Sequence, residues 1–146
     1  MEKRNKIPIT VQIVLEKGED ILLMKRKNTG YADGQYCLPG GHVEANEEIR
    51  KALAREAKEE IGITIKSQDM EFYKVLNRKV NEQQEYIDFI FKAKNWTGKI
   101  QNIEKEKCEE IKWANKNKLP ANILDFIPKI LKDSESIYMS HNWKEE

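Results

Sequence analysis

The feature that most constrains this chain is a helical segment enclosed by glycine-containing turns. Leu38-Pro39-Gly40-Gly41 precedes the segment, Gly62 follows it, and residues 46–61 between them have the clearest helical period in the chain. We expect Asn46 to cap the first turn, because its side-chain oxygen can accept a hydrogen bond from a free backbone N–H. Glu47 and Glu48, which follow it, suit the positive end of the helix dipole. Gly62 can adopt the left-handed backbone conformation that commonly ends a helix. The sequence therefore predicts one helix whose two ends are fixed by backbone turns.

Glutamates on this helix break the pattern of a solvated helix face. Glu56 and Glu60 continue the apolar stripe that Ile49 and Leu53 begin, and Glu59 flanks it. Like charges at this spacing cost about 0.2–0.5 kcal/mol per pair in an isolated helix, and the last turn of a helix prefers cations. A solvated Glu and Lys face explains the other charges of the helix but not Glu56 and Glu60. A divalent cation resolves the conflict, since clustered carboxylates form a hard-oxygen site that suits Mg²⁺ or Mn²⁺.

Segments with a strand period surround this helix. We expect strands at 7–15, 21–26, 63–65, 70–80, 86–94 and 111–114, loops at 27–35 and 95–110, and a second helix at 123–132. In the strand at 86–94, Asp88 alternates with phenylalanines, which predicts one buried face and one wet face. Strands, a helix, more strands and a final helix indicate one α+β or α/β domain over residues 1–146.

Composition narrows the classes of function. The 26 Lys and Arg nearly cancel the 25 Asp and Glu, which argues against a protein that binds nucleic acid polymers through bulk charge. No apolar run approaches the roughly 18 residues of a membrane span, and the charged start shows no secretory signal. Cys37 and Cys108 lack a metal-type spacing, so we expect reduced thiols. These observations favour a small cytoplasmic domain without a membrane partner.

Residues 41–63 also carry a recognisable motif. Gly41 is followed after five residues by Glu47, and after seven more by Arg55-Glu56-Ala57-Lys58-Glu59-Glu60-Ile61-Gly62-Ile63. This pattern resembles the Nudix box of the MutT-type hydrolases at every defining position, and the preceding Leu38-Pro39-Gly40 also fits that family. The expected order of elements agrees with the Nudix fold. The resemblance therefore implies an α/β/α sandwich of the α+β class, with a mixed sheet between helices.

The resemblance implies chemistry that depends on a divalent cation. Members of this family hydrolyse a nucleoside diphosphate linked to another group, using Mg²⁺ or Mn²⁺ and an attacking water. A metal ion neutralises phosphate oxygens and lowers the pKa of bound water, while a carboxylate can accept the proton. By motif position, the implied metal ligands are the Gly40 carbonyl and the side chains of Glu56, Glu59 and Glu60. The implied general base is Glu56 or, as second choice, Glu59.

Four other residues of the motif would support the site. Glu47 and Arg55 resemble a structural ion pair that holds the preceding loop against the helix, and Arg55 can also orient a carboxylate. Gly41 lets the backbone approach the metal closely, because glycine has no side chain. Gly62 ends the helix directly after the acidic turn.

Two regions outside the motif resemble substrate contacts. Arg26 lies fourteen residues before Gly40, the spacing of a substrate-contacting arginine in MutT-type enzymes, although a surface arginine would look the same. Tyr31 and Tyr36, in the loop before the motif, are candidates for lining a base pocket. Asn122, after Pro120 and Ala121, resembles an asparagine that hydrogen-bonds the nucleobase, since an amide both donates and accepts. Its alternative role is to cap the last helix.

A further metal ligand is implied downstream. Trp96-x-Gly98 followed by Glu104 resembles the segment that supplies a late metal glutamate in those enzymes. Other acidic residues of the same charged loop compete for this role, namely Glu106, Glu109 and Glu110. Simple solvation of the loop is the alternative for all of them.

The substrate class follows from what the chain lacks. No proline lies between Pro39 and Pro120, where ADP-ribose hydrolases usually carry one, and the signatures of coenzyme A and NADH hydrolases are also absent. The resemblance therefore favours a (d)NTP pyrophosphohydrolase that releases a monophosphate and diphosphate, with oxidised nucleotides as one possible substrate. The alternatives are another nucleoside diphosphate derivative (nucleotide sugar, ADP-ribose or dinucleotide) and a non-catalytic nucleotide sensor. The sensor fits poorly, because non-catalytic members of the family usually lose glutamates of the box and here all of them are present. We expect the chain to act as a monomer or homodimer.

Overall fold

The computed structural model describes residues 3–144, and within them eight strands, two α-helices and one 3₁₀ turn follow one another. The elements are β1 (Ile9–Lys17), β2 (Asp20–Arg26), β3 (Tyr36–Cys37), β4 (Gly40–His42), α1 (Ile49–Ile61), η1 (Ser67–Asp69), β5 (Glu71–Asn81), β6 (Gln84–Ala93), β7 (Cys108–Asn115), α2 (Phe126–Lys132) and β8 (Tyr138–His141). None of the helices in this part of the chain is long and apolar enough to cross a membrane.

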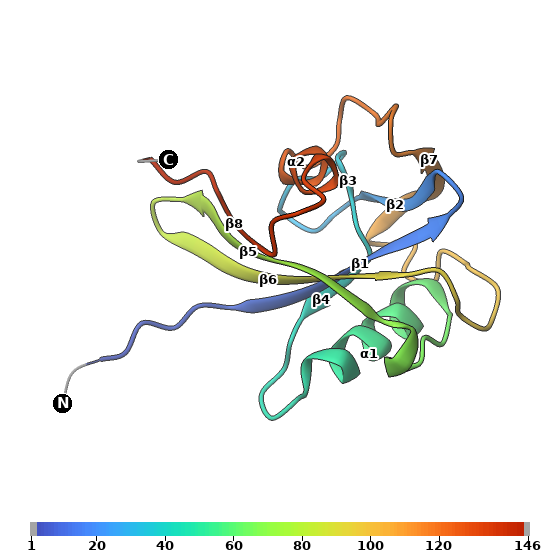
Figure 1. Cartoon of the computed structure of the whole chain (residues 1–146), viewed down its shortest axis with the longest axis horizontal. Helices are drawn as coiled ribbons and strands as arrows, with labels where there is room; N and C mark the ends of the chain where they lie inside the picture. Colours follow the sequence, from blue (N-terminus) through green and yellow to red (C-terminus); the bar gives the residue numbers. More distant parts are fainter. Residues whose placement is uncertain (1–2, 145–146) are drawn as a thin grey trace.

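Strand β1 is the centre of the sheet (Figure 1). It runs parallel to β6 along its length, while its first half pairs antiparallel with β4 and its last two residues pair with β2. The strand order is β3-β2-β1-β6-β5-β8, with β7 added on β2. The sheet is therefore mixed, as expected.

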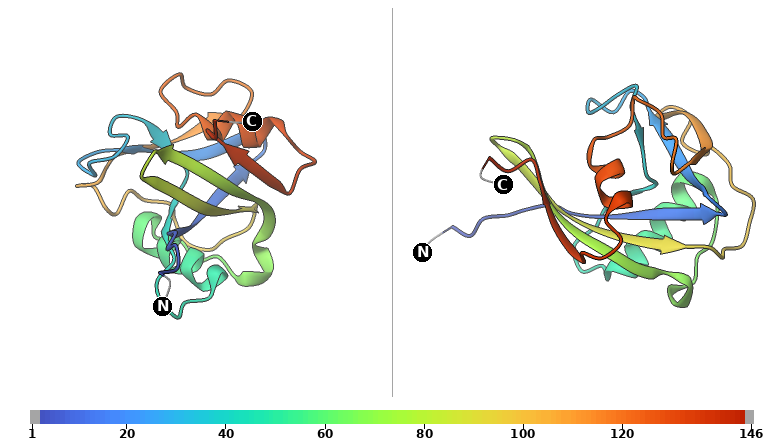
Figure 2. Two further views of the ribbon diagram at one scale, coloured as in Figure 1. Left: turned by 90° about the vertical axis from the view of Figure 1, so that its left-hand side faces the viewer. Right: turned by 45° about the horizontal axis from the view of Figure 1, so that its top comes forward.

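The two helices cover opposite faces of this sheet, which Figures 1 and 2 show from three directions. Alternate residues of β1 divide between two cores, because successive side chains of a strand point to opposite faces. Val11 and Ile13 pack in a cluster with Leu53 of α1, whereas Val14 packs in a cluster with Phe126 of α2. The expected α/β/α sandwich is confirmed.

The start of the first helix differs from the expectation. Asn46 has φ of +61°, outside the extended region that an N-cap residue adopts, so it does not cap the helix. Glu48 is the N-cap, and its carboxylate accepts a hydrogen bond from the backbone N–H of Arg50 at 3.0 Å. The end agrees with the prediction: Gly62 has φ of +76°, and its N–H donates to the carbonyl of Lys58.

Three element boundaries were wrong for reasons of tertiary pairing. The expected strand at 63–65 is a single bridge between Thr64 and Thr97. Strand β7 begins at Cys108, because pairing with β2 extends it into the acidic segment. Helix α2 begins only at Phe126, because residues 122–124 run beside Tyr36 and exchange backbone hydrogen bonds with it.

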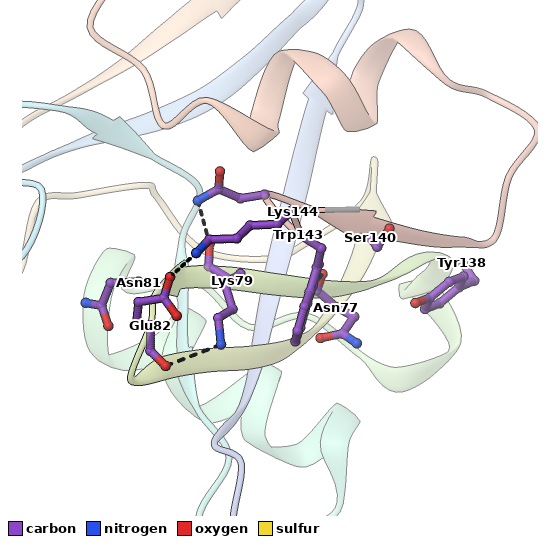
Figure 3. Close-up of a pocket in the computed structure, with 9 residues that line it drawn as sticks. Asn77, Lys79, Asn81, Glu82, Tyr138, Ser140, Trp143 and Lys144 are labelled. Carbon is purple, nitrogen blue, oxygen red and sulfur yellow. Dashed lines mark hydrogen bonds and ion pairs between the residues drawn. The ribbon is translucent and has the colours of Figure 1, made fainter. Parts of the chain in front are cut away.

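The C-terminal segment adds β8 to the edge of the sheet, in parallel with β5. A cavity of about 790 Å³ lies against this segment, lined by residues of the β5–β6 hairpin and of the tail (Figure 3). There the indole N–H of Trp143 donates to the carbonyl of Asn77 at 3.0 Å, and the Lys79 ammonium lies 4.9 Å from the ring centre. None of the residues lining this cavity belongs to the motif at 41–63.

Candidate active site

The turn between β3 and β4 brings the backbone against the end of α1. The backbone N–H of Gly40 donates to Oε1 of Glu60 at 2.8 Å. A Cβ on Gly40 would lie 2.1 Å from the carbonyl oxygen of Val11, so this approach requires glycine. The sequence thus places the Gly40 backbone and one glutamate of the helix in direct contact.

Glu56 occupies the space above the second glycine of the turn. A Cβ on Gly41 would meet its carboxylate carbon and Oε1 at 2.5 Å. The Glu56 side chain is 15% exposed, and Nη1 of Arg55 donates to its Oε1 at 2.9 Å. Burial raises the pKa of Glu56 and the neighbouring Arg55 opposes this shift, so the carboxylate is held in place by one positive partner.

Arg55 joins the loop before α1 to the acidic face of the helix. Its Nε and Nη2 donate to the two carboxylate oxygens of Glu47 at 2.8 and 3.0 Å, and Nη2 also donates to the carbonyl of His42 at 3.1 Å. Hydrogen bonding from Arg55 lowers the pKa of Glu47 to about 2. This bidentate geometry fixes the guanidinium, whose Nη1 also reaches Glu59 at 3.3 Å.

Glu60 is the most desolvated carboxylate of the group. Burial raises its pKa to about 8, against the hydrogen bond from Gly40, and the charges of Glu56 and Glu104 raise it further. Glu104 also contributes to the raised pKa of Glu56. The charge of Glu104, in the loop after β6, thus acts on both helix glutamates, and its role as a metal ligand stays a prediction from the resemblance.

The carboxylate oxygens at this end of α1 are of the type that a hard divalent cation prefers, although their side chains are not arranged as a complete coordination shell. Among residues 3–144, no three His, Cys, Asp or Glu side chains stand in metal-binding geometry. Arg55 pairs with Glu56 and Glu59 at 2.9 and 3.3 Å, and its positive charge offsets part of the repulsion between these two carboxylates. The donor set itself is carboxylate oxygens beside a half-buried glycine turn, which matches Mg²⁺ or Mn²⁺ better than zinc.

A hollow of about 120 Å³ opens beside the Gly40–Gly41 turn, and Arg26 and Tyr31 are among its lining residues. Nε of Arg26 donates to the carbonyl of Tyr31 at 2.7 Å and Nη2 donates to the Thr29 hydroxyl at 3.1 Å. Arg26 thus faces the candidate site and also holds the loop between β2 and β3.

Tyr36 does not lie where a residue of a base pocket is expected, and Asn122 does not take its alternative role as a helix cap. Tyr36 is 5% exposed, its hydroxyl donates to the Glu110 carboxylate, and it does not line the hollow. Asn122 does not cap α2; its amide donates to the carbonyl of Gly34 at 2.9 Å, and it lines a neighbouring cavity of about 540 Å³ together with Tyr31. Of the two tyrosines considered for a base pocket, the structure brings Tyr31 to the site.

Sequence reasoning missed a polar group at the floor of the hollow. Thr10, Gln12 and Arg78 line the hollow, and all three are bonded to Asp88, which is fully buried. The expectation that Asp88 lies on a wet face of its strand was therefore wrong. The signal was present in the sequence as Thr10 and Gln12, two polar residues on one side of an otherwise apolar strand.

A family model described as "NUDIX domain" matches residues 6–133. The chain belongs to the NUDIX family. This family generally uses divalent metal ions, in accord with the acidic end of α1.

Individual relatives cover different shares of the chain. An "ADP-ribose pyrophosphatase" from Methanocaldococcus jannaschii is 46% identical over 55 residues, which are 38% of this chain and 32% of that protein. An "8-oxo-dGTP diphosphatase" from Proteus vulgaris is 32% identical over 65 residues, 44% of this chain and 58% of that protein. The matches thus span less than two thirds of either relative. The crystal structure of a MutT NUDIX hydrolase from Burkholderia pseudomallei has the same fold, with a TM-score of 0.80, 22% identity and coverage of 90% of this chain and 100% of that one.

Within this NUDIX site, we expect alanine substitutions at Gly40 and at Gly41 to cause different defects. We expect Gly41→Ala to fold, because the new methyl meets the end of a flexible side chain, and to displace the Glu56 carboxylate from the turn. Gly40→Ala should instead lower the melting temperature, because its methyl meets the backbone of Val11. Thermal melts and hydrolysis assays on both variants check this. A stable Gly40→Ala, or a Gly41→Ala with unchanged kcat, would contradict the geometry.

Proposed function

We propose that this NUDIX-family hydrolase is a Mg²⁺- or Mn²⁺-dependent pyrophosphohydrolase of nucleoside triphosphates, which releases a nucleoside monophosphate and diphosphate. The observation that carries the proposal is the acidic end of α1 against the Gly40–Gly41 turn, beside an open hollow. Similarity to the Proteus vulgaris diphosphatase supports a triphosphate substrate, including an oxidised purine nucleotide. We place the activity in one cytoplasmic domain of residues 1–146, acting as a monomer or homodimer on a small nucleotide.

The residue roles that we propose rest on motif position and on the contacts described above. Gly40, Glu56, Glu59, Glu60 and Glu104 would hold the metal. When bound, the cation would neutralise phosphate oxygens and lower the pKa of an attacking water. Glu56 would accept the proton of that water, with Glu59 as second choice, because Glu56 is half-buried and fixed by Arg55. Arg26 would contact substrate phosphate or sugar from the rim of the hollow.

A second substrate class is supported by the archaeal relative. Its 55 matched residues are more similar to this chain than those of the diphosphatase, and its printed name specifies ADP-ribose. The same acidic site would cleave that diphosphate, since the bond broken is again a phosphoric anhydride whose negative oxygens a divalent cation would neutralise. Nucleotide sugars and dinucleotides belong to this class as well.

A hydrolysis panel distinguishes these substrates. We would assay normal and oxidised (d)NTPs, ADP-ribose, nucleotide sugars and dinucleotides with Mg²⁺, with Mn²⁺ and with chelator. Turnover of triphosphates that stops with chelator supports the proposal, and activity confined to the other substrates overturns the triphosphate assignment. Nucleotide binding without any turnover would identify a sensor instead.

The late metal ligand has its own test. We expect Glu104→Gln to raise the Mg²⁺ concentration for half-maximal activity by at least about tenfold, the lower range for loss of a residue that supports a metal site. Glu106→Gln is the matched control, because it removes the same charge from the same loop and its side chain is exposed. A Mg²⁺ titration of kcat checks both. Equal shifts in the two variants would mean that Glu104 acts only through general charge.

A further inference from the structure

The floor of the hollow is a buried polar network that the metal chemistry does not require. Asp88 accepts a bidentate pair of hydrogen bonds from Arg78, at 2.7 Å from Nε and 3.0 Å from Nη2. The Thr10 hydroxyl donates to Oδ1 of Asp88 at 2.5 Å, and Nε2 of Gln12 donates to the same oxygen at 3.3 Å. The Asp88 carboxylate therefore accepts four hydrogen bonds, and Arg78 neutralises its charge.

This network fixes which way the Gln12 amide points. The Thr10 hydroxyl has only one proton, and that proton is used on Asp88. Toward Gln12 it can then only accept, so Nε2 of Gln12 must be the atom that faces it, at 3.2 Å. The amide nitrogen is bound on both sides by Thr10 and Asp88, and the carbonyl Oε1 is left pointing away from the network.

The free oxygen of Gln12 sits on a residue that lines the hollow. Gln12 is 8% exposed and lines the cavity beside the Gly40–Gly41 turn, with Gly40 opposite it in the β1–β4 ladder. Among residues 3–144, no donor reaches its Oε1, and this atom is not one of the buried, unpartnered side-chain atoms. An acceptor that is fixed in direction, on a mostly buried side chain that lines a cavity, is suited to receive a hydrogen bond from a ligand.

We propose that Gln12 determines substrate specificity by accepting a hydrogen bond from the exocyclic amino group of the substrate's nucleobase. This inference rests on the proposed function, since it takes the hollow as the site of the nucleoside. A phosphate oxygen would not bind there, because it is itself an acceptor and would face Oε1 lone pair to lone pair. The aromatic rings of Tyr31 and Tyr86 line the same hollow and supply a surface for a flat base. Asp88 is the positioning residue that holds the amide in the reading orientation.

The test uses pairs of nucleotides that differ at the amino group: GTP with ITP, ATP with purine riboside triphosphate, and CTP with UTP. In at least one pair, we expect the wild-type chain to prefer the amino-bearing nucleotide in kcat/KM by about two- to tenfold, the range of one net hydrogen bond. Gln12→Met keeps the length of the side chain and removes the acceptor, so it should abolish that preference. Gln68→Met, an exposed glutamine on η1, is the matched control and should retain it.

Each result has a definite meaning. A wild-type chain that discriminates none of the pairs, or a folded Gln12→Met that keeps the preference, overturns the inference while the hydrolase function stands. If Gln12→Met keeps the preference for the amino group but loses discrimination between ribo- and deoxyribonucleotides, Gln12 contacts the sugar, and the inference is also overturned. If no nucleotide is turned over, the proposed function fails. Binding of the base can then be tested by itself, from calorimetric Kd values for three pairs of monophosphates: GMP and IMP, AMP and purine riboside monophosphate, and CMP and UMP. Equal affinities within every pair would refute it.

Discussion

Glu56→Gln should lower kcat by about 10²–10⁴-fold, the usual contribution of a general base, while the chain remains folded. The substitution keeps the shape of the side chain and its acceptor oxygen toward Arg55, but it removes the negative charge and the site of protonation. The carboxylate lies against the glycine turn, where a substrate phosphate would approach, so loss of its charge should affect the chemical step directly. Steady-state kinetics at saturating Mg²⁺ would measure this effect.

Two comparisons make this result specific. Glu71→Gln removes one charge from an exposed position on β5 and should leave kcat unchanged. Glu59→Gln tests the second candidate for the base: its side chain is 51% exposed and bonded to Arg55 at 3.3 Å, and we expect a smaller loss. A larger loss in Glu59→Gln than in Glu56→Gln would exchange the two roles. Near-normal kcat in both would refute the assignment of the acidic end of α1 as the catalytic centre.

The parts of the fold that the sequence predicted are those set by local chemistry. The amphipathic stripe of α1 and its glycine stop depend on neighbours within a few residues, and both are where the pattern placed them. The same is true of β1, β2 and the β5–β6 hairpin. The helix start was missed because two nearby side chains can serve as caps. Asn46 takes a left-handed backbone, and Glu48 caps instead.

The parts that could not be predicted depend on pairing between distant segments. The hydrophobic period of β6 cannot show that helices cover both faces of this strand. The sequence therefore predicted a solvated Asp88, whereas the residue is buried and Arg78 of the neighbouring strand β5 neutralises its charge. Likewise, nothing local to Tyr36 indicates that residues 122–124 run beside it, or that its side chain is buried. Glu104 lies in the long loop between β6 and β7, and its role as a metal ligand stays a prediction that rests on the family motif and not on the local sequence.

The buried pair of Arg78 and Asp88 should dominate the stability of the sheet face that lines the hollow. Asp88 is 0% exposed and Arg78 7%, and the guanidinium lies 4.8 Å from the ring centre of Phe126 and 4.9 Å from that of Tyr86. Replacing only Asp88 by Leu would leave a positive charge between two rings without its partner, which costs about 3–5 kcal/mol in comparable buried pairs. Urea unfolding of the Asp88→Leu variant should show this loss in the free energy of unfolding.

A double substitution separates the charge from the packing. Asp88→Leu with Arg78→Met removes both charges together, so we expect it to be clearly more stable than Asp88→Leu alone, because no buried charge is left unpaired. Glu109→Gln is the control, since it breaks an ion pair of similar length with Lys25, 2.9 Å, whose carboxylate is 53% exposed, and it should change stability little. If Asp88→Leu and the double variant unfold at the same urea concentration, the pair contributes through shape and not through charge.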